Sequence, residues 1–291
     1  MPRVAVPLAV LALLVVSGCT LRTVGTEQRK TAGPAPAAVQ RAYNLDADFY
    51  DRSYQNNTAP VAPSAVIGGT VPHHLLASHL LAAFFEGLAP QQPSIIVLVG
   101  PNHLGYGSTD ITTSRLAWQT TGGELQPALE VIDILVNSGV AVVDERLFSE
   151  EHSISGPMGF VGYSLPRSRV VAIALKERVT ETTAQTLAEV LNRVLPADAV
   201  VVASTDFSHT VTSPVADAQD AVSIQVLEAM GTGRMSEVHV DSPASRYTLL
   251  YFLKLRAATH GQLLTSSNAA KLTATPQMAD VTSYITMYYT K

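Results

Sequence analysis

The amino-acid sequence predicts a single α/β domain in which helices flank a mixed, mostly parallel central sheet. Two observations predict this fold class. From about Ser64 onwards, short runs rich in β-branched residues alternate with longer stretches of helical period. The chain has 291 residues and is 47% hydrophobic, which suffices for an apolar core of one large domain.

The predicted strands are the β-branched runs that end in turn residues. We expect strands at 65–68, 95–99, 141–143, 170–175, 200–204, 262–265 and 281–288. The predicted helices are stretches whose apolar residues recur every three or four positions. We expect helices at 75–88, 126–138, 181–195, 214–231 and 244–259.

The first eighteen residues have the features of a lipoprotein signal peptide. Arg3 precedes an apolar run over residues 5–16, and two small residues precede Cys19. The run is shorter than the ~20 residues of a spanning helix, and small residues before a cysteine suit a signal peptidase. The alternatives are an ordinary secretory peptide or a short anchor helix. We expect a lipid on Cys19, a membrane-anchored protein, and a location in the cell envelope on the periplasmic or extracellular side.

The predicted domain organisation is a signal peptide at 1–18, a lipidated tether at 19–63 and the α/β domain at 64–291. The tether is rich in Thr, Ala, Pro and Asn and has no sustained apolar period. Within it, the aromatic stretch 43–54 belongs either to the tether or to an arm that packs on the domain. Cys19 is the only cysteine, so the domain has neither a disulfide nor a thiolate ligand.

The charge of the chain excludes one class of partner. The formal net charge is -5 and the sequence pI is about 5.9, and basic residues form no patch in the sequence. Nucleic acid is therefore not an expected partner.

Three histidines follow predicted strands directly: His73, His103 and His209. Ligands of open α/β sheets gather outside the carboxyl ends of the strands, so these imidazoles are expected to converge. Imidazole is a common ligand of transition metals at neutral pH. The pattern therefore indicates a metal site.

Other polar residues have two interpretations each. Asp206 lies three residues before His209. It has either a role in the site, where it orients an imidazole or touches the metal, or a structural role as the cap of the next turn. His152 beside Glu151 suits proton transfer or a structural hydrogen bond. Asp241 precedes a predicted helix, a position that first suggests a helix cap.

These motifs together resemble the Memo family, known in bacteria as AmmeMemoRadiSam system protein B. The resemblance covers about residues 64–291 and rests on PHHLLASHL, GPNH, EHSI, STDFSH, DSPAS and the terminal TSY. Memo proteins are similar in fold to class III extradiol dioxygenases, which hold non-haem iron with two histidines and a carboxylate.

The resemblance implies a ligand set. His73 and His103 match the two histidines of the family at the metal. The position of the cysteine ligand of animal Memo proteins corresponds here to Asp241, with Ser242 as the alternative. Replacing a thiolate by a carboxylate favours Fe(II) over copper. His209 and Asp206 match the histidine and aspartate beside the metal, and we prefer His209 over His152 for proton transfer.

The expected function is that of a metal-binding oxidoreductase of dioxygenase type, which uses Fe(II) on an unknown small molecule at the cell envelope. Copper or zinc are the other candidate metals. The alternatives are a non-catalytic envelope lipoprotein that binds metal or a peptide, and a zinc-dependent hydrolase.

Overall fold

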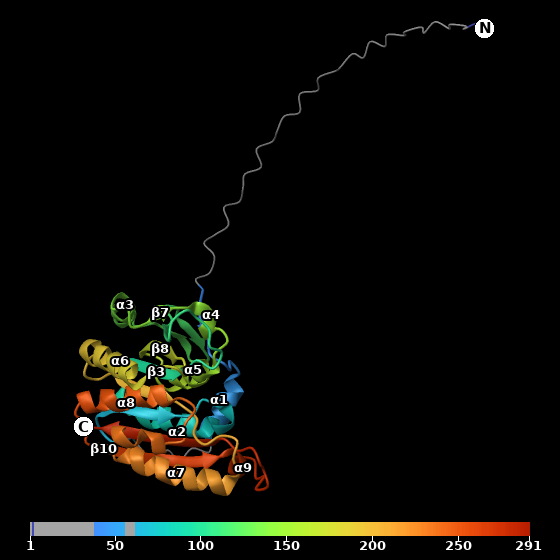
Figure 1. Ribbon diagram of the computed structural model, residues 1–291, viewed down its shortest axis with the longest axis vertical. Helices are drawn as coiled ribbons and strands as arrows, with labels where there is room; N and C mark the ends of the chain where they lie inside the picture. The colour runs from blue at the N-terminus through green and yellow to red at the C-terminus, as the bar shows by residue number, and fades with distance from the viewer. Residues whose placement is uncertain (1, 3–37, 56–61) are drawn as a thin grey trace. The chain divides into compact units, whose positions relative to one another are not determined.

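The computed structural model describes residues 2, 38–55 and 62–291, and residues 38–291 form one compact unit (Figure 1). The predicted signal peptide, Cys19 and most of the predicted tether lie outside the described residues. Among the helices of the described part, none has the length and apolarity that a membrane crossing requires.

Eight strands form the central sheet. They are β2 (Val66–Val71), β3 (Ile95–Pro101), β4 (Ile111–Thr113), β7 (Val142–Val143), β8 (Arg169–Leu175), β9 (Val200–Ser204), β10 (His260–Asn268) and β11 (Ser283–Thr290). Their order is β10-β11-β2-β9-β3-β8-β4-β7. The inner strands β2, β9, β3 and β8 are parallel, whereas β10, β11 and β4 pair antiparallel with their inner neighbours. The predicted mixed α/β sheet is thus confirmed.

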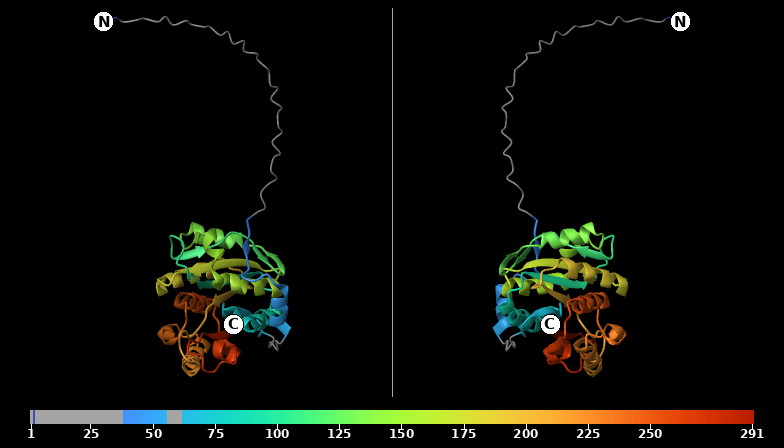
Figure 2. Two further views of the ribbon diagram at one scale, coloured as in Figure 1. Left: turned by 90° about the vertical axis from the view of Figure 1, so that its right-hand side faces the viewer. Right: turned by 90° about the vertical axis from the view of Figure 1, so that its left-hand side faces the viewer.

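Helices cover both faces of this sheet (Figures 1 and 2). The α-helices are α1 (Ala47–Gln55), α2 (Ser78–Leu88), α3 (Leu129–Asn137), α4 (Glu145–Phe148), α5 (His152–Ser164), α6 (Glu181–Val194), α7 (Ser213–Glu228), α8 (Pro243–Leu255) and α9 (Ala269–Leu272). Short 3-10 helices lie at η1 (Leu75–Ala77), η2 (Ala89–Gln91) and η3 (Thr232–Glu237). A small second sheet joins β1 (Gln40–Arg41), β5 (Trp118–Thr120) and β6 (Gly123–Leu125).

Strand β3 shows how the sheet separates two cores. Its residues Ile95, Val97 and Val99 pack with α3, α6 and α8, whereas Ile96 and Leu98 pack with α2 and α5. Because successive side chains of a strand point to opposite faces, a strand buried on both faces must be apolar throughout. This explains why IIVLVG predicted a strand so clearly.

The folded unit begins before the predicted domain boundary at Ser64. Residues 38–55, assigned above to the tether, contain β1 and α1 and pack on the domain. Tyr50 of α1 is fully buried and lies against Phe160 of α5, with ring centroids 5.0 Å apart. The aromatic stretch 43–54 is therefore a packed arm, because Phe49, Tyr50 and Tyr54 pack against the core that includes α5, whereas Tyr43 remains exposed.

Helix α5 was not predicted from the sequence. It contains Pro157 and several glycines, which have low helix propensity. Two of these glycines are required by close packing. A Cβ atom on Gly159 would lie 1.8 Å from the Tyr50 hydroxyl, and one on Gly162 would lie 2.1 Å from Thr120 Oγ1. The sequence of α5 therefore reflects its neighbours α1 and β5 rather than helical preference.

Candidate metal centre

Three neighbouring parallel strands each carry a polar side chain at the same place. His73, His103 and Asp206 are each the second residue after the end of β2, β3 and β9. These strands are adjacent in the sheet, in the order β2-β9-β3. The carboxyl ends of parallel strands meet at one edge, so the topology brings the three residues together. The sequence predicted this convergence for His73, His103 and His209.

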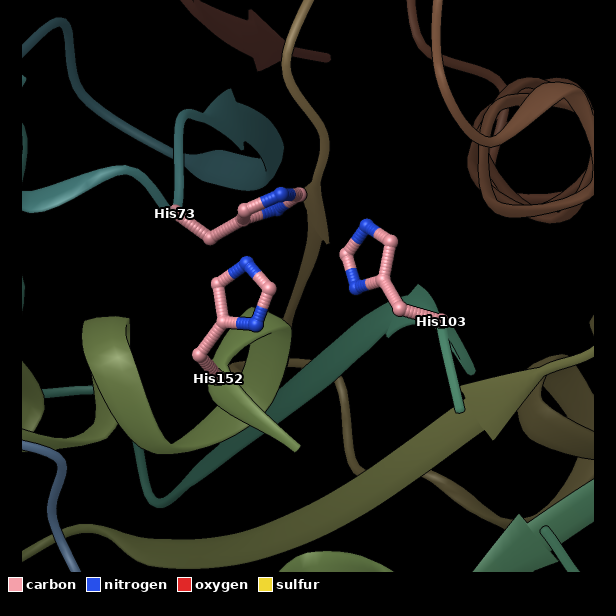
Figure 3. A group of neighbouring side chains, drawn as sticks. All are labelled: His73, His103 and His152. Carbon is pink, nitrogen blue, oxygen red and sulfur yellow. The ribbon is translucent and has the colours of Figure 1, made fainter. Parts of the chain in front are cut away.

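A group of three imidazoles lies at this edge: His73, His103 and His152 (Figure 3). One nitrogen of each ring lies within 4.8 Å of one nitrogen of the other two. The rings of His103 and His152 are stacked, with centroids 4.7 Å apart, and the His73 ring stands nearly perpendicular to both. Side-chain rotations would be needed to bring all three nitrogens within bonding distance of one divalent ion.

The third histidine is not the one expected. We predicted that His209 would join His73 and His103, but the residue that joins them is His152, the first residue of α5. His209 is exposed and lines a cavity of about 410 Å³ that Asp241 also lines. His152 was missed as a cluster member because its helix has a poor helical sequence, so its position relative to the sheet was not predictable.

Asp241 adds a carboxylate to the three imidazoles. Its Oδ2 lies 3.2 Å from His73 Nε2 and 3.7 Å from His103 Nε2. These contacts are not aligned as hydrogen bonds, and both carboxylate oxygens are buried without a hydrogen-bond partner. His73 Nδ1 is likewise buried and unpartnered. Buried polar atoms normally have partners, so this donor set fits a cation between the carboxylate and the imidazoles.

Asp241 is not the helix cap that its position first suggested. The cap of α8 is Ser242, whose hydroxyl accepts a hydrogen bond from the amide of Ser245. Ser242 was the alternative for the ligand position, and its hydroxyl is already occupied by the hydroxyl of Ser245 at 2.7 Å. The Asp241 carboxylate therefore remains the oxygen donor of this segment.

Asp206 contacts His73 rather than His209. Its Oδ1 accepts a 3.0 Å hydrogen bond from the amide of His73, and its Oδ2 lies 3.6 Å from His73 Nε2. The carbonyl of Asp206 also accepts from the amide of Asp241 at 3.1 Å. Asp206 thus joins two segments of the site and does not cap a turn.

Glu151 is a further carboxylate of the site, and the sequence indicated it only as the neighbour of His152. It is fully buried, and its two oxygens accept three hydrogen bonds. Oε2 accepts from the amide of His103 at 2.7 Å, and Oε1 pairs with His103 Nδ1 at 2.8 Å and accepts from the amide of Ser153 at 2.9 Å. The only signal in the sequence was its place beside His152.

Burial and the carboxylates have opposite effects on the imidazoles. Burial disfavours the charged form of His73, but Asp206 and Asp241 outweigh burial and raise its pKa. The pKa of His103 rises to about 10, because contacts with Asp241 and Glu151 likewise outweigh burial. The pKa of His152 is lowered by burial and by the positive charges of His73 and His103.

The pKa values of the carboxylates are lowered, whereas those of His73 and His103 are raised. Burial opposes ionisation of Asp241 and Glu151. Contacts with His103 and His73 nevertheless hold the pKa of Asp241 well below its usual range. The pKa of Glu151 is lowered by its bonds to His103 and Ser153. Without a metal, the charged forms of these imidazoles and of the buried carboxylates therefore stabilise one another.

Cavities open beside the site. One of about 180 Å³ is lined by both His103 and Asp241. A second, of about 600 Å³, shares His103 and extends to Lys176 and Arg178. A small molecule can therefore approach the partly exposed imidazole of His103 from solvent, beside the segment of Asp241.

The fold and this site define the class of the protein as an α/β protein with a candidate metal centre of nitrogen and oxygen donors. Within that class, the chain belongs to the Memo family, because the Memo-like protein family matches residues 44–288. The resemblance noted in the sequence is thereby confirmed.

Relatives in archaea support this assignment. A MEMO1 family protein of Methanothermobacter thermautotrophicus is 30% identical over 203 residues, which are 67% of this chain and 72% of that protein. One of Thermococcus kodakarensis is 34% identical over 187 residues, 60% of this chain and 62% of that protein. One of Pyrobaculum aerophilum is 26% identical over 186 residues, 62% and 66% of the two chains. The aligned part thus spans less than two thirds of the last two relatives.

Proposed function

We propose that this chain is a metal-dependent oxidoreductase of dioxygenase type that acts on a small molecule. The observation that carries the proposal is the Asp241 carboxylate, buried without hydrogen-bond partners and facing Nε2 of His73 and of His103. Two histidines and one carboxylate form the facial triad of non-haem Fe(II) oxygenases. Fe(II) bound there would supply the oxygen and electron-transfer chemistry of such a reaction.

The remaining residues have separate roles in this proposal. His152 lies beside His73 and His103, and burial lowers its pKa, which favours the neutral imidazole that can accept a proton from a substrate beside the triad. His209 lies at the cavity that Asp241 lines and is the second candidate for that role. Asp206 holds the amide of His73 and so fixes the start of the segment that carries this ligand.

The test is the metal content of the purified protein, measured by elemental analysis in wild type, His73→Ala, His103→Ala and Asp241→Ala. We expect iron in wild type after loading with Fe(II) and its loss in the three variants. Oxygen consumption with catechols and small phenols then tests the reaction. Equal, near-zero metal in all four proteins would refute metal binding, whereas metal without oxygen consumption would favour a non-catalytic protein that binds metal or a peptide.

A zinc hydrolase is the second candidate, and one observation favours it. The three imidazoles alone form a three-histidine group, a ligand set of catalytic zinc, which leaves a fourth position for water. His152→Ala separates the candidates. Loss of metal in His152→Ala but not in Asp241→Ala would favour zinc, and the reverse pattern would favour the triad.

We also propose that the protein is anchored in the cell envelope by a lipid on Cys19. The support is the sequence alone: one basic residue, a short apolar run and small residues before the only cysteine. Expression of Cys19→Ser in a bacterial host, followed by membrane fractionation, tests the proposal. Wild type is expected in the membrane fraction and the variant outside it, and equal distribution of both would contradict a lipid anchor.

A further inference from the structure

Glu151 is bonded to one imidazole of the site and precedes another. Its Oε1 lies 2.8 Å from His103 Nδ1 and 3.6 Å from His152 Nδ1. Its Oε2 accepts from the His103 amide at 2.7 Å, so the carboxylate holds both the backbone and the ring of His103. Among the carboxylates of the site, Glu151 is fully buried, which leaves little freedom for these contacts to change.

The contact at Nδ1 determines which nitrogen of His103 is available. An ionised carboxylate accepts hydrogen bonds only, so Nδ1 must carry the proton. In the neutral ring, Nε2 then carries the lone pair, and Nε2 is the atom that faces Asp241 at 3.7 Å. The same hydrogen bond fixes the plane of the ring and raises its basicity as a ligand.

Glu151 also places His152. It is the N-cap of α5, and its side chain accepts from the amide of Ser153 at 2.9 Å. Ser153 in turn donates its hydroxyl to the carbonyl of Pro101 at 2.7 Å, at the end of β3. The first turn of α5 is therefore fixed against the strand that leads to His103, and the rings of His152 and His103 stack.

We propose that Glu151 is a positioning residue that sets the tautomer and orientation of His103 and, through the cap of α5, the place of His152. One carboxylate thus organises two of the three imidazoles. The effect of Glu151 on metal binding rests on the proposed metal function, because a metal ion requires an ordered Nε2 that carries no proton.

Glu151→Asp separates capping from positioning. Aspartate retains the charge and is a good N-cap residue, so α5 keeps its cap. Its side chain is shorter by one methylene and cannot hold both the amide and Nδ1 of His103. Glu145→Gln is the matched control, because Glu145 accepts from the amide of Arg115 and the hydroxyl of Ser114, away from the histidines.

The first readout is NMR of the full chain labelled with 15N-histidine, with His103→Ala to assign the signals. We expect a ring N–H signal of His103 at low field, protected from exchange, in wild type and Glu145→Gln but not in Glu151→Asp. This readout needs no metal. Absence of the signal in wild type, or its survival in Glu151→Asp, would overturn the inference.

The second readout is the affinity for Zn²⁺, measured by competition with a chromophoric chelator. We expect Glu151→Asp to bind ~10–100-fold more weakly than wild type, as is typical when an outer-shell partner is lost. Unchanged affinity in Glu151→Asp would overturn the positioning role. If wild type binds no Zn²⁺, the proposed metal function fails, while the NMR readout still decides whether Glu151 orders His103.

Discussion

The hydroxyl of Ser204 donates a 2.5 Å hydrogen bond to the backbone carbonyl of Ser153. In a regular helix this carbonyl would accept from the amide of residue 157, but that residue is Pro157, which has no N–H. Ser204, the last residue of β9, therefore supplies the missing donor. Pro157 lowers the helix propensity of α5. It also leaves the Ser153 carbonyl free to accept a hydrogen bond from the sheet beside the metal centre.

Ser204→Ala is expected to lower the free energy of unfolding by ~1–3 kcal/mol, because it leaves the buried carbonyl of Ser153 unpaired. Urea denaturation measures the change. In a Pro157→Ala background the loss should be smaller, since the amide of residue 157 can then donate to Ser153. An equal loss of free energy of unfolding for Ser204→Ala in both backgrounds would show that the Ser204 hydroxyl and the amide of residue 157 do not replace one another.

Asp241→Asn is expected to weaken Zn²⁺ binding by more than the ~10–100-fold typical of an outer-shell partner. The reason is that the substitution removes a negatively charged donor that faces His73 and His103. Isothermal titration calorimetry measures the affinity. The matched control is Asp220→Asn, a carboxylate held by Ser208 and Ser283 away from the imidazoles. Equal affinities of the two variants would argue against Asp241 as a ligand.

The stability of the metal-free protein is expected to be highest between about pH 4 and pH 6.5. These limits are the pKa values of aspartate and of histidine in the unfolded chain. His103 has a pKa raised to about 10, so its contribution is complete below its unfolded value and is lost as the pH rises towards 10. The pKa of Asp241 is lowered, so its contribution is complete above its unfolded value and is lost as the pH falls.

Denaturation of the metal-free protein at several pH values tests this window. His103→Ala should flatten the decline between about pH 6.5 and pH 10, because the group responsible for it is gone. A decline of the same slope in His103→Ala would assign the pH dependence to other groups.

Gly159→Ala is expected to destabilise the protein by ~1–3 kcal/mol, although alanine is the better helix former. The added Cβ atom would lie 1.8 Å from the hydroxyl of Tyr50, so α1 or α5 must shift. Thermal unfolding measures the loss, and Gly233→Ala is the control, because a Cβ atom there meets nothing within 4 Å. A Gly159→Ala protein as stable as wild type would mean that the arm does not pack tightly on α5.

Several features of the site were predictable because they depend on local pattern and on sheet topology. His73 and His103 each follow a short run that predicts a buried strand, and parallel strands end at one edge of the sheet. The same reasoning was applied to His209, whereas Asp206 was considered only because it lies three residues before His209. The motifs around these residues also identified the family, which the match over residues 44–288 confirmed.

The part that was not predictable depends on contacts distant in sequence. The sequence around His152 contains the proline and glycines that are typical of a loop. It nevertheless forms helix α5, which contacts Ser204, Tyr50 and Thr120 and places His152 at the site. The role of Glu151 is invisible for the same reason, since its partner His103 lies 48 residues away along the chain.

The sequence by itself determined the α/β class, the family and the two histidines that end β2 and β3, because hydrophobic period and strand topology are encoded locally. Only the tertiary structure decided that His152 rather than His209 joins them, that Asp241 faces them without an aligned hydrogen bond, and that residues 38–55 belong to the domain. These outcomes depend on which surfaces pack together, and such packing is set by the whole chain at once.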